Sequence, residues 1–192
     1  MRQIKQKLVD YLDGKLQGNG IAQQAISVKD ARTVFVEACR ACVGIREATG
    51  HNDGPLVEAL QDTIGGHSGE PWCMSTMQSC LAYAELKTGI KSPIYPSEYC
   101  INVWAQTPVE QRVKSIPLPG AIVIWKHGNT SSGHTGCVIG ADEKTFQAVE
   151  GNTTSGTDPN GKVIREGGGC YFTKRSMAGN GDMHVVGFLK AF

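Results

Sequence analysis

The stretch GGHSGEPWCMSTMQSCLAYAELKTG, residues 65–89, organises the chain because it opens a helix on a cysteine. The glycines at its start allow a tight entry, and Pro71 favours the first turn of a helix. Cys73 is therefore predicted in that first turn, where unpaired backbone N–H groups and the positive end of the helix dipole favour a thiolate. Cys80 falls further along, on the apolar stripe of the same helix, and is interpreted as a buried thiol. On position alone, Cys73 is either a nucleophile or a buried cysteine beside a tryptophan.

Two different periodicities divide the rest of the chain. Apolar residues at helical spacing predict helices over residues 4–16, 31–45, 55–63, 71–87 and 97–105. Ser27 and Asp30 have the spacing of a capping box ahead of the second helix. Short β-branched or aromatic segments bounded by turn residues predict strands over residues 121–125, 135–140, 145–150, 170–175 and 184–190. Because the strands follow one another too closely for intervening helices, we predict an α+β domain with helices packed on one face of an antiparallel sheet of about five strands.

Length and charge limit the classes of partner. A chain of 192 residues suits one compact domain, and we expect residues 1–26 to form an N-terminal helical extension of a domain over residues 27–192. The net charge of +1, from 19 basic and 18 acidic residues, gives no electrostatic reason to expect nucleic acid as a partner. We also expect the protein to be a monomer. No stretch reaches the roughly 18 consecutive apolar residues of a membrane span.

The N-terminal residues also bear on where the protein is made. They begin basic, as a signal peptide does, but charged residues from Asp10 to Lys15 interrupt any apolar stretch. We therefore expect synthesis in the cytoplasm without a signal peptide, and reduced thiols for the seven cysteines.

A thiolate enzyme needs a histidine to share its proton, and His134 is the best candidate among five. It lies in SSGHTGCVIG, at the entry to an apolar strand, where its orientation would be fixed. The other histidines lie in loops or at strand edges. The alternative is a histidine at a strand start with no catalytic role.

An orienting partner for His134 is expected at the end of the next strand, in AVEGNTT. Glu150 and Asn152 are two residues apart, so they share a face if the strand continues. A short loop makes the two strands a hairpin, which brings His134 and Glu150 together. The alternative is a solvated carboxylate and a turn asparagine. We expect Glu150 to be the direct partner, because a charge-assisted hydrogen bond is about twice as strong as a neutral one.

Three other motifs are interpreted as structural. Cys39 and Cys42 form a C-x-x-C, but both fall on a helical apolar stripe and are predicted to be buried thiols. His134 with Cys137 supplies only two nearby zinc ligands. The glycines at 167–169 precede a strand and not a helix, so they are not a phosphate loop.

Four segments, in this order, resemble the CHAP family: GEPWC opening a helix, PLPGAIVIW, SSGHTGCVIG and VEGN. The similarity extends over residues 35–192 and includes the closing segment HVVGFLK. The family comprises cysteine/histidine-dependent amidohydrolases and peptidases that cut peptidoglycan. The resemblance implies a papain-like α+β core with Cys73 as nucleophile, His134 as base and Glu150 with Asn152 as the orienting pair.

The chain departs from the family pattern at two points. Ala121 replaces the acid of the common PGDIV segment. Some members bind calcium through several Asp residues before the cysteine, where this chain has only Glu70. Because calcium requires several oxygen ligands, no metal site is expected there, and no cofactor is expected at all.

The resemblance implies hydrolysis of an amide bond of the peptidoglycan stem, by an N-acetylmuramoyl-L-alanine amidase or by an endopeptidase. Without a signal or a wall-binding module, the chain is expected to be a phage endolysin. It would be made in the host cytoplasm and act on the cell wall in the periplasm after the inner membrane is permeabilised. The alternatives are an antibacterial toxin delivered into a rival cell, a cytosolic papain-like thiol protease, or a wall-binding module without turnover.

Overall fold

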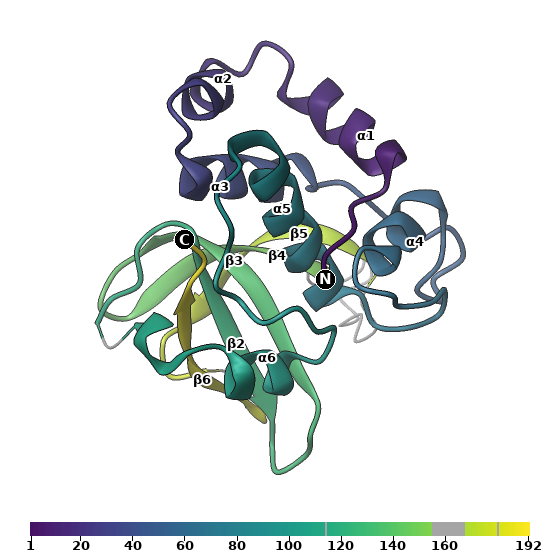
Figure 1. The fold of residues 1–192 in the computed structure, drawn as a ribbon. Helices are drawn as coiled ribbons and strands as arrows, with labels where there is room; N and C mark the ends of the chain where they lie inside the picture. The colour runs from purple at the N-terminus through teal and green to yellow at the C-terminus, as the bar shows by residue number, and fades with distance from the viewer. Residues whose placement is uncertain (114, 155–167, 180) are drawn as a thin grey trace.

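The computed structural model describes residues 1–113, 115–154, 168–179 and 181–192. In that part of the chain the helices come first and all of the strands follow (Figure 1). The helices are α1 (Gln6–Leu16), α2 (Gly20–Ser27), α3 (Ala31–Ala41), α4 (Pro55–Asp62), α5 (Cys73–Thr88) and α6 (Cys100–Gln106). The strands are β1 (Arg112–Val113), β2 (Ala121–His127), β3 (Gly133–Ala141), β4 (Thr145–Thr153), β5 (Gly169–Ser176) and β6 (Met183–Lys190).

The strands form one antiparallel sheet with the order β1-β6-β2-β3-β4-β5. Strands β2 to β5 follow one another as a meander, and β6 returns to pair with the other side of β2. The predicted α+β class and antiparallel sheet are confirmed, and a two-residue strand, β1, adds a sixth strand at the edge. The pairing places His134 of β3 opposite Trp125 of β2, and Val149 of β4 opposite Cys137 of β3.

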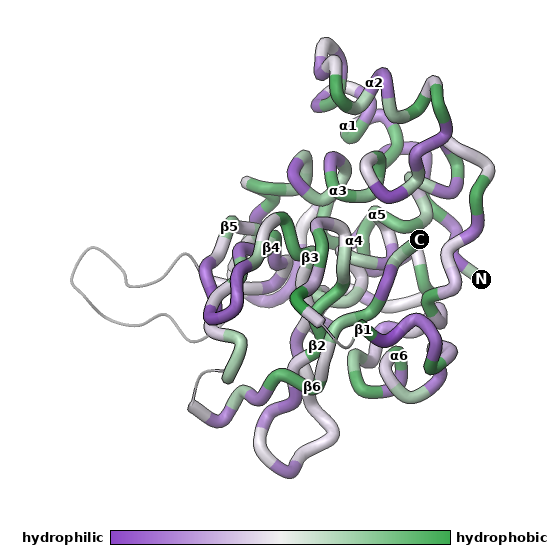
Figure 2. The backbone as a smooth tube through the Cα atoms, turned by 90° about the vertical axis from the view of Figure 1, so that its left-hand side faces the viewer, coloured by the Kyte–Doolittle hydropathy of each residue, from purple (hydrophilic) through white to green (hydrophobic). Residues whose placement is uncertain are grey.

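Apolar side chains cover both faces of this sheet. On one face, α3 and α5 pack against β3, and α6 packs against β2 and β3 (Figure 1). Figure 2 shows hydrophobic stretches along the central strands and along α3 beside them. On the other face a second cluster contains Val123, Trp125, Val138, Phe146 and Phe188. Helix α5 lies among α3, α4 and the strands, so nearly all of its residues are buried and its first residue is held in place from several sides.

The starts of three helices, α2, α3 and α5, differ from the prediction. Asn19 caps an additional helix, α2, by accepting a hydrogen bond from the Ala22 N–H at 3.0 Å, so Ser27 ends a helix and does not cap one. Asp30 is the actual N-cap of α3, because its carboxylate accepts from the Thr33 N–H at 3.1 Å. Pro71 lies before α5 and not in its first turn, although Cys73 does occupy that turn.

Residues 1–26 pack into the same core as the rest of the chain. Leu8 and Leu12 of α1 have no exposed surface and belong to the cluster that contains α3 and α5. The Arg2 guanidinium donates to the Glu85 carboxylate of α5 at 2.8 Å. The division of the chain at residue 27 stays a prediction.

The C-x-x-C cysteines are buried thiols, as predicted. Cys39 and Cys42 have no exposed surface, and the Cys42 sulfur lies 3.6 Å from that of Cys80. Among the described residues, no group of three or more histidine, cysteine or acidic side chains is arranged to hold a metal ion. No helix of the described ranges is both long and apolar enough to cross a bilayer. The glycine at 167 lies outside the described residues.

Truncating Leu12 to alanine tests whether α1 folds together with the rest of the chain. We expect Leu12→Ala to lower the free energy of unfolding by about 2–5 kcal/mol, because it opens a cavity in the shared core. The measurement is urea unfolding followed by the fluorescence of Trp72, Trp104 and Trp125, which all lie outside residues 1–26. Leu86→Ala is the matched control, since Leu86 is 57% exposed. An unchanged midpoint for Leu12→Ala would show that residues 1–26 fold separately.

Candidate active site

Cys73 lies at the N-terminal end of α5, where the backbone N–H groups of the first turn have no partner within the helix. Its side chain is 6% exposed. The N-cap residue, Trp72, is fully buried, and its indole Nε1 donates to the Glu47 carboxylate at 2.9 Å. Gly151 of β4 lets α5 lie against the sheet, because a Cβ there would overlap the Thr76 hydroxyl. These contacts fix the position of the sulfur relative to the strands.

His134 is the second residue of β3, at the edge of the core as predicted. Its ring stacks on the Trp125 indole, with centroids 5.5 Å apart and planes inclined by 27°. The preceding Gly133 is required, because a Cβ there would lie 2.6 Å from the Trp125 carbonyl oxygen and 3.0 Å from Cys100 Cβ. Strand pairing and stacking together fix the orientation of the imidazole.

Glu150 of β4 is the hydrogen-bond partner of His134, with 3.0 Å between His134 Nε2 and Glu150 Oε2. The carboxylate has no exposed surface. Arg175 of β5 donates to both of its oxygens, from Nε at 2.8 Å and from Nη2 at 2.5 Å, and the Thr173 hydroxyl donates to Oε1. Gly136 of β3 makes room for this arrangement, because a Cβ there would lie 2.8 Å from Glu150 Cγ. The buried carboxylate is thus held by a cation on either side.

The charges of these side chains stabilise one another. Burial raises the pKa of Glu150, but the hydrogen bonds and charges of Arg175 and His134 outweigh burial and lower that pKa to about 2. Burial lowers the pKa of His134, but its contacts with Cys73 and Glu150 raise the pKa to about 10. A hydrogen bond with Cys100 and the contact with His134 lower the pKa of Cys73 well below that of a free thiol, against the effect of burial. Both shifts favour the charged pair, a thiolate beside an imidazolium.

The expectation that Asn152 shares the face of Glu150 toward His134 is wrong in its geometry. The pairing of β4 with β5 shifts between Glu150 and Thr153, which marks a bulge. Asn152 sits in that bulge with a left-handed backbone, φ 50°. Two residues along the strand therefore do not return to the same face, and within the described ranges no hydrogen bond joins Asn152 to His134.

The residues that support this arrangement were not predicted from the sequence. Arg175 and Thr173 alternate along β5 and could have been proposed from their spacing, but only the pairing of β5 with β4 brings them to Glu150. Trp125 and Glu47 carried no signal of their own. The remaining candidates do not join the site: Cys137 is fully buried within β3, and His51 contacts Thr49 in an exposed loop.

A cavity of about 250 Å³ opens at the cysteine. Cys73 and Cys100 line it from the two helix starts, Gly133 lines it from β3, and Glu70 and Tyr99 flank it. A carbonyl group placed in this cavity would lie near the sulfur and the N-terminal end of α5. The site thus has an entrance for a substrate.

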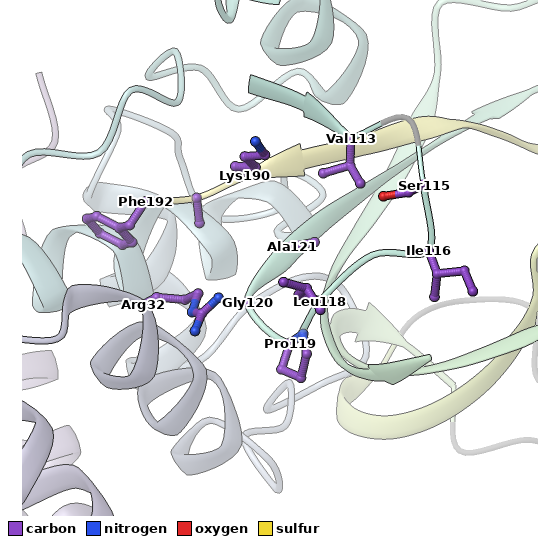
Figure 3. A pocket seen from close by; sticks show the side chains of 11 residues that line it. Arg32, Val113, Ser115, Ile116, Leu118, Pro119, Gly120, Ala121, Lys190 and Phe192 are labelled. Atoms are coloured by element: carbon purple, nitrogen blue, oxygen red, sulfur yellow. The ribbon is translucent and has the colours of Figure 1, made fainter. Parts of the chain in front are cut away.

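Another cavity, of about 340 Å³, lies between the start of β2 and the C-terminus (Figure 3). Arg32 and Lys190 are its charged residues, and Leu118 and Phe192 are among its apolar ones. Among the described residues, its lining contains no cysteine, histidine or carboxylate side chain. It therefore lacks the combination of thiol and imidazole found at the cavity beside Cys73.

A thiolate at a helix start, an imidazolium that can give up a proton, and a buried carboxylate that orients the imidazolium form the arrangement required for nucleophilic attack on a carbonyl carbon. These three groups come from the start of α5 (Cys73), from β3 (His134) and from β4 (Glu150).

Residues 65–152 match the family model described as CHAP domain. This match contains Cys73, His134, Glu150 and Asn152, and it ends before β5. No curated protein matches the chain.

Substituting Gly136 tests the packing that admits Glu150. We expect Gly136→Ala to destabilise the fold by about 1–3 kcal/mol through overpacking. It should also slow alkylation of Cys73 by iodoacetamide at pH 6, because a displaced Glu150 no longer supports the imidazolium. Gly140→Ala is the matched control in the same strand, since no atom lies within 4 Å of a Cβ built there. Equal alkylation rates in the two variants would contradict the role given to Gly136.

Proposed function

We propose that this chain, whose residues 65–152 match the CHAP domain, is a cysteine/histidine-dependent amidohydrolase or peptidase that acts on peptidoglycan, with Cys73, His134 and Glu150 as its catalytic residues. The observation that carries this proposal is the contact of His134 Nε2 with the buried Glu150 carboxylate at 3.0 Å, beside a cysteine whose pKa is lowered. A cysteine and a histidine with only structural roles would not require an ionised carboxylate in the core.

The proposed reaction begins with attack of the Cys73 thiolate on the carbonyl carbon of an amide bond. The negative charge that develops on the carbonyl oxygen is stabilised by the backbone N–H of Cys73 at the start of α5. His134 then donates its proton to the leaving amine, which departs and leaves an acyl group on the sulfur. In the second half, His134 takes a proton from water, and the resulting hydroxide releases the acyl group.

Glu150 is proposed to keep the imidazolium in place and charged through this cycle. Because Nε2 contacts Glu150, the other ring nitrogen, Nδ1, is proposed to exchange the proton during the reaction. Arg175 acts through Glu150 as a positioning residue, because its two hydrogen bonds hold the carboxylate ionised and in the plane required by His134. Asn152 is proposed to shape the bulge that ends β4.

The proposed substrate is an amide bond of the peptidoglycan stem, either the bond between muramic acid and L-alanine or a bond within the stem peptide. The proposed setting is the lysis of a host cell by a phage, with the enzyme made in the cytoplasm and acting on the wall once the inner membrane is permeabilised. The family's chemistry supports the substrate class, and the setting rests on the expectations drawn from the sequence.

Removing the sulfur tests the chemistry and identifies the bond in one experiment. We expect Cys73→Ala to abolish the digestion of purified peptidoglycan while the fold is retained, because contacts with Cys100 and His134 lower the pKa of Cys73, whereas the contact with Cys73 and burial raise the pKa of Cys100, the other thiol at the cavity. Mass spectrometry of the soluble fragments from the wild-type digest assigns the bond, since an amidase releases free stems and an endopeptidase leaves shortened stems on the sugar. Cys137→Ala is the matched control, a cysteine in β3 outside the cavity. Turnover by Cys73→Ala would exclude the thiolate mechanism.

Comparing Glu150→Gln with Asn152→Ala tests which residue orients His134. The thiolate–imidazolium pair exists above the pKa of Cys73 and is lost as pH rises through the His134 pKa of about 10. Glu150→Gln removes the charge that raises this pKa, so we expect the alkaline limb of the activity profile to move to lower pH and the rate to fall by about 10²-fold. Asn152→Ala should cost less and leave the limb in place. An inactive Asn152→Ala beside an active Glu150→Gln would assign the role to the asparagine.

A further inference from the structure

A second thiol faces the nucleophile across the substrate cavity. Cys100, the first residue of α6, has its sulfur 3.9 Å from that of Cys73. Cys100 is 5% exposed, and both cysteines line the cavity. A hydrogen bond with Cys100 lowers the pKa of Cys73, but no bond-making or bond-breaking step of the proposed hydrolysis uses the Cys100 sulfur.

We propose that Cys100 is a resolving thiol, which forms a reversible disulfide with Cys73 after a peroxide oxidises the nucleophile. The proposal rests on Cys73 being the reactive thiolate of the proposed function. Both cysteines line the substrate cavity. The disulfide would therefore consume the Cys73 thiolate and also obstruct the binding of substrate.

The distance between the sulfurs is suited to this reaction. A disulfide requires about 2.05 Å between sulfur atoms, so the two must approach by roughly 2 Å. Side-chain rotation has that range, and the cavity between the two cysteines gives the sulfurs space to move. The thiols also differ in character: contacts with Cys100 and His134 lower the pKa of Cys73, whereas the contact with Cys73 and burial raise the pKa of Cys100. Cys73 therefore favours the nucleophilic thiolate, whereas Cys100 favours the neutral thiol.

The steps balance with hydrogen peroxide as the oxidant. The Cys73 thiolate attacks one peroxide oxygen, the O–O bond breaks, and the products are the Cys73 sulfenic acid and hydroxide. The Cys100 sulfur then attacks the Cys73 sulfur, its thiol proton goes to the departing hydroxyl, and water leaves as the S–S bond forms. The two cysteines lose two electrons in total, and the peroxide gains them. A dithiol reductant reverses the reaction by thiol–disulfide exchange.

A second pair of neighbouring thiols shows why proximity alone is insufficient for oxidation to a disulfide. The sulfurs of Cys42 and Cys80 are even closer, at 3.6 Å, yet both side chains have no exposed surface. Hydrogen bonds with Cys39 and Cys42 lower the pKa of Cys80 to about 5, but full burial leaves peroxide no path to either sulfur. The closer pair is therefore expected to stay reduced, which makes it an internal control.

The experiment uses the full chain, treated with a small excess of hydrogen peroxide, then alkylated, digested with trypsin and analysed by mass spectrometry. Trypsin places Cys73 on the peptide 47–87 and Cys100 on the peptide 92–112. We expect a linked pair of these peptides, about 2 Da below the summed masses of the reduced forms because two hydrogens are lost. The Cys80→Ala variant should give the same linkage, which assigns it to Cys73 because the first peptide then holds no other cysteine.

Activity on peptidoglycan is followed in parallel. It should fall in proportion to the linked fraction and return with dithiothreitol. In Cys100→Ser, measured against its own untreated activity, longer exposure should convert Cys73 to the sulfinic acid, so the recovered fraction should be lower than in the wild type.

Accumulation of the Cys73 sulfinic acid in the wild type without any linked peptide would overturn the proposal, as would a linked protein that keeps full activity. A linked pair in a chain whose untreated form does not digest peptidoglycan would refute the proposed function and leave the thiol pairing standing.

Discussion

The buried charge of Glu150 is the constraint on which the rest of the site depends. A carboxylate without exposed surface is costly unless every oxygen has a partner, and here the partners are Arg175, Thr173 and His134. These partners come from the two strands that flank β4. Any change in how β3, β4 and β5 pair would therefore leave an uncompensated charge in the core, so the site and the central sheet stabilise the same arrangement.

The charges alternate along the sheet in the order of its strands. Arg175 on β5 is positive, Glu150 on β4 is negative, His134 on β3 is positive, and the Cys73 thiolate at the start of α5 is negative. Each group lowers the free energy of the next one in its charged form, which is why the imidazole stays protonated to a pKa of about 10 despite burial. The N-terminal end of α5 closes this series with the partial positive charge of the helix dipole. Arg175 on β5 thus helps to stabilise, through Glu150 and His134, a thiolate that borders the cavity.

Most of what the sequence predicted is local. Cys73 in a first helical turn, His134 at a strand start and Glu150 at the end of the adjoining strand all follow from a helix signal and one hairpin, in which neighbours along the chain are neighbours in space. Arg175 and Cys100 escaped prediction because they reach the site through contacts between distant segments, the pairing of β5 with β4 and the approach of α6 to Gly133. Asn152 was predicted on the wrong face because a bulge breaks the two-residue period of the strand. Helix α2 was not predicted because the glycines around Asn19 were interpreted as the end of one helix and not also as the start of the next.

The seven cysteines of one chain show how position determines the chemistry of a thiol. Five of them, Cys39, Cys42, Cys80, Cys137 and Cys170, have no exposed surface and fill the core between helices and sheet as small apolar groups. The two that border the cavity lie at helix starts, and only one of those two also contacts a histidine held by a carboxylate. The contact that makes the Cys73 sulfur nucleophilic toward a carbonyl carbon makes it equally reactive toward peroxide, because the thiolate is the reactive form in both reactions. The neighbouring Cys100 thiol, 3.9 Å away, helps to lower the pKa of Cys73, and in the proposed oxidation it also gives the oxidised nucleophile a reversible state in place of an irreversible one.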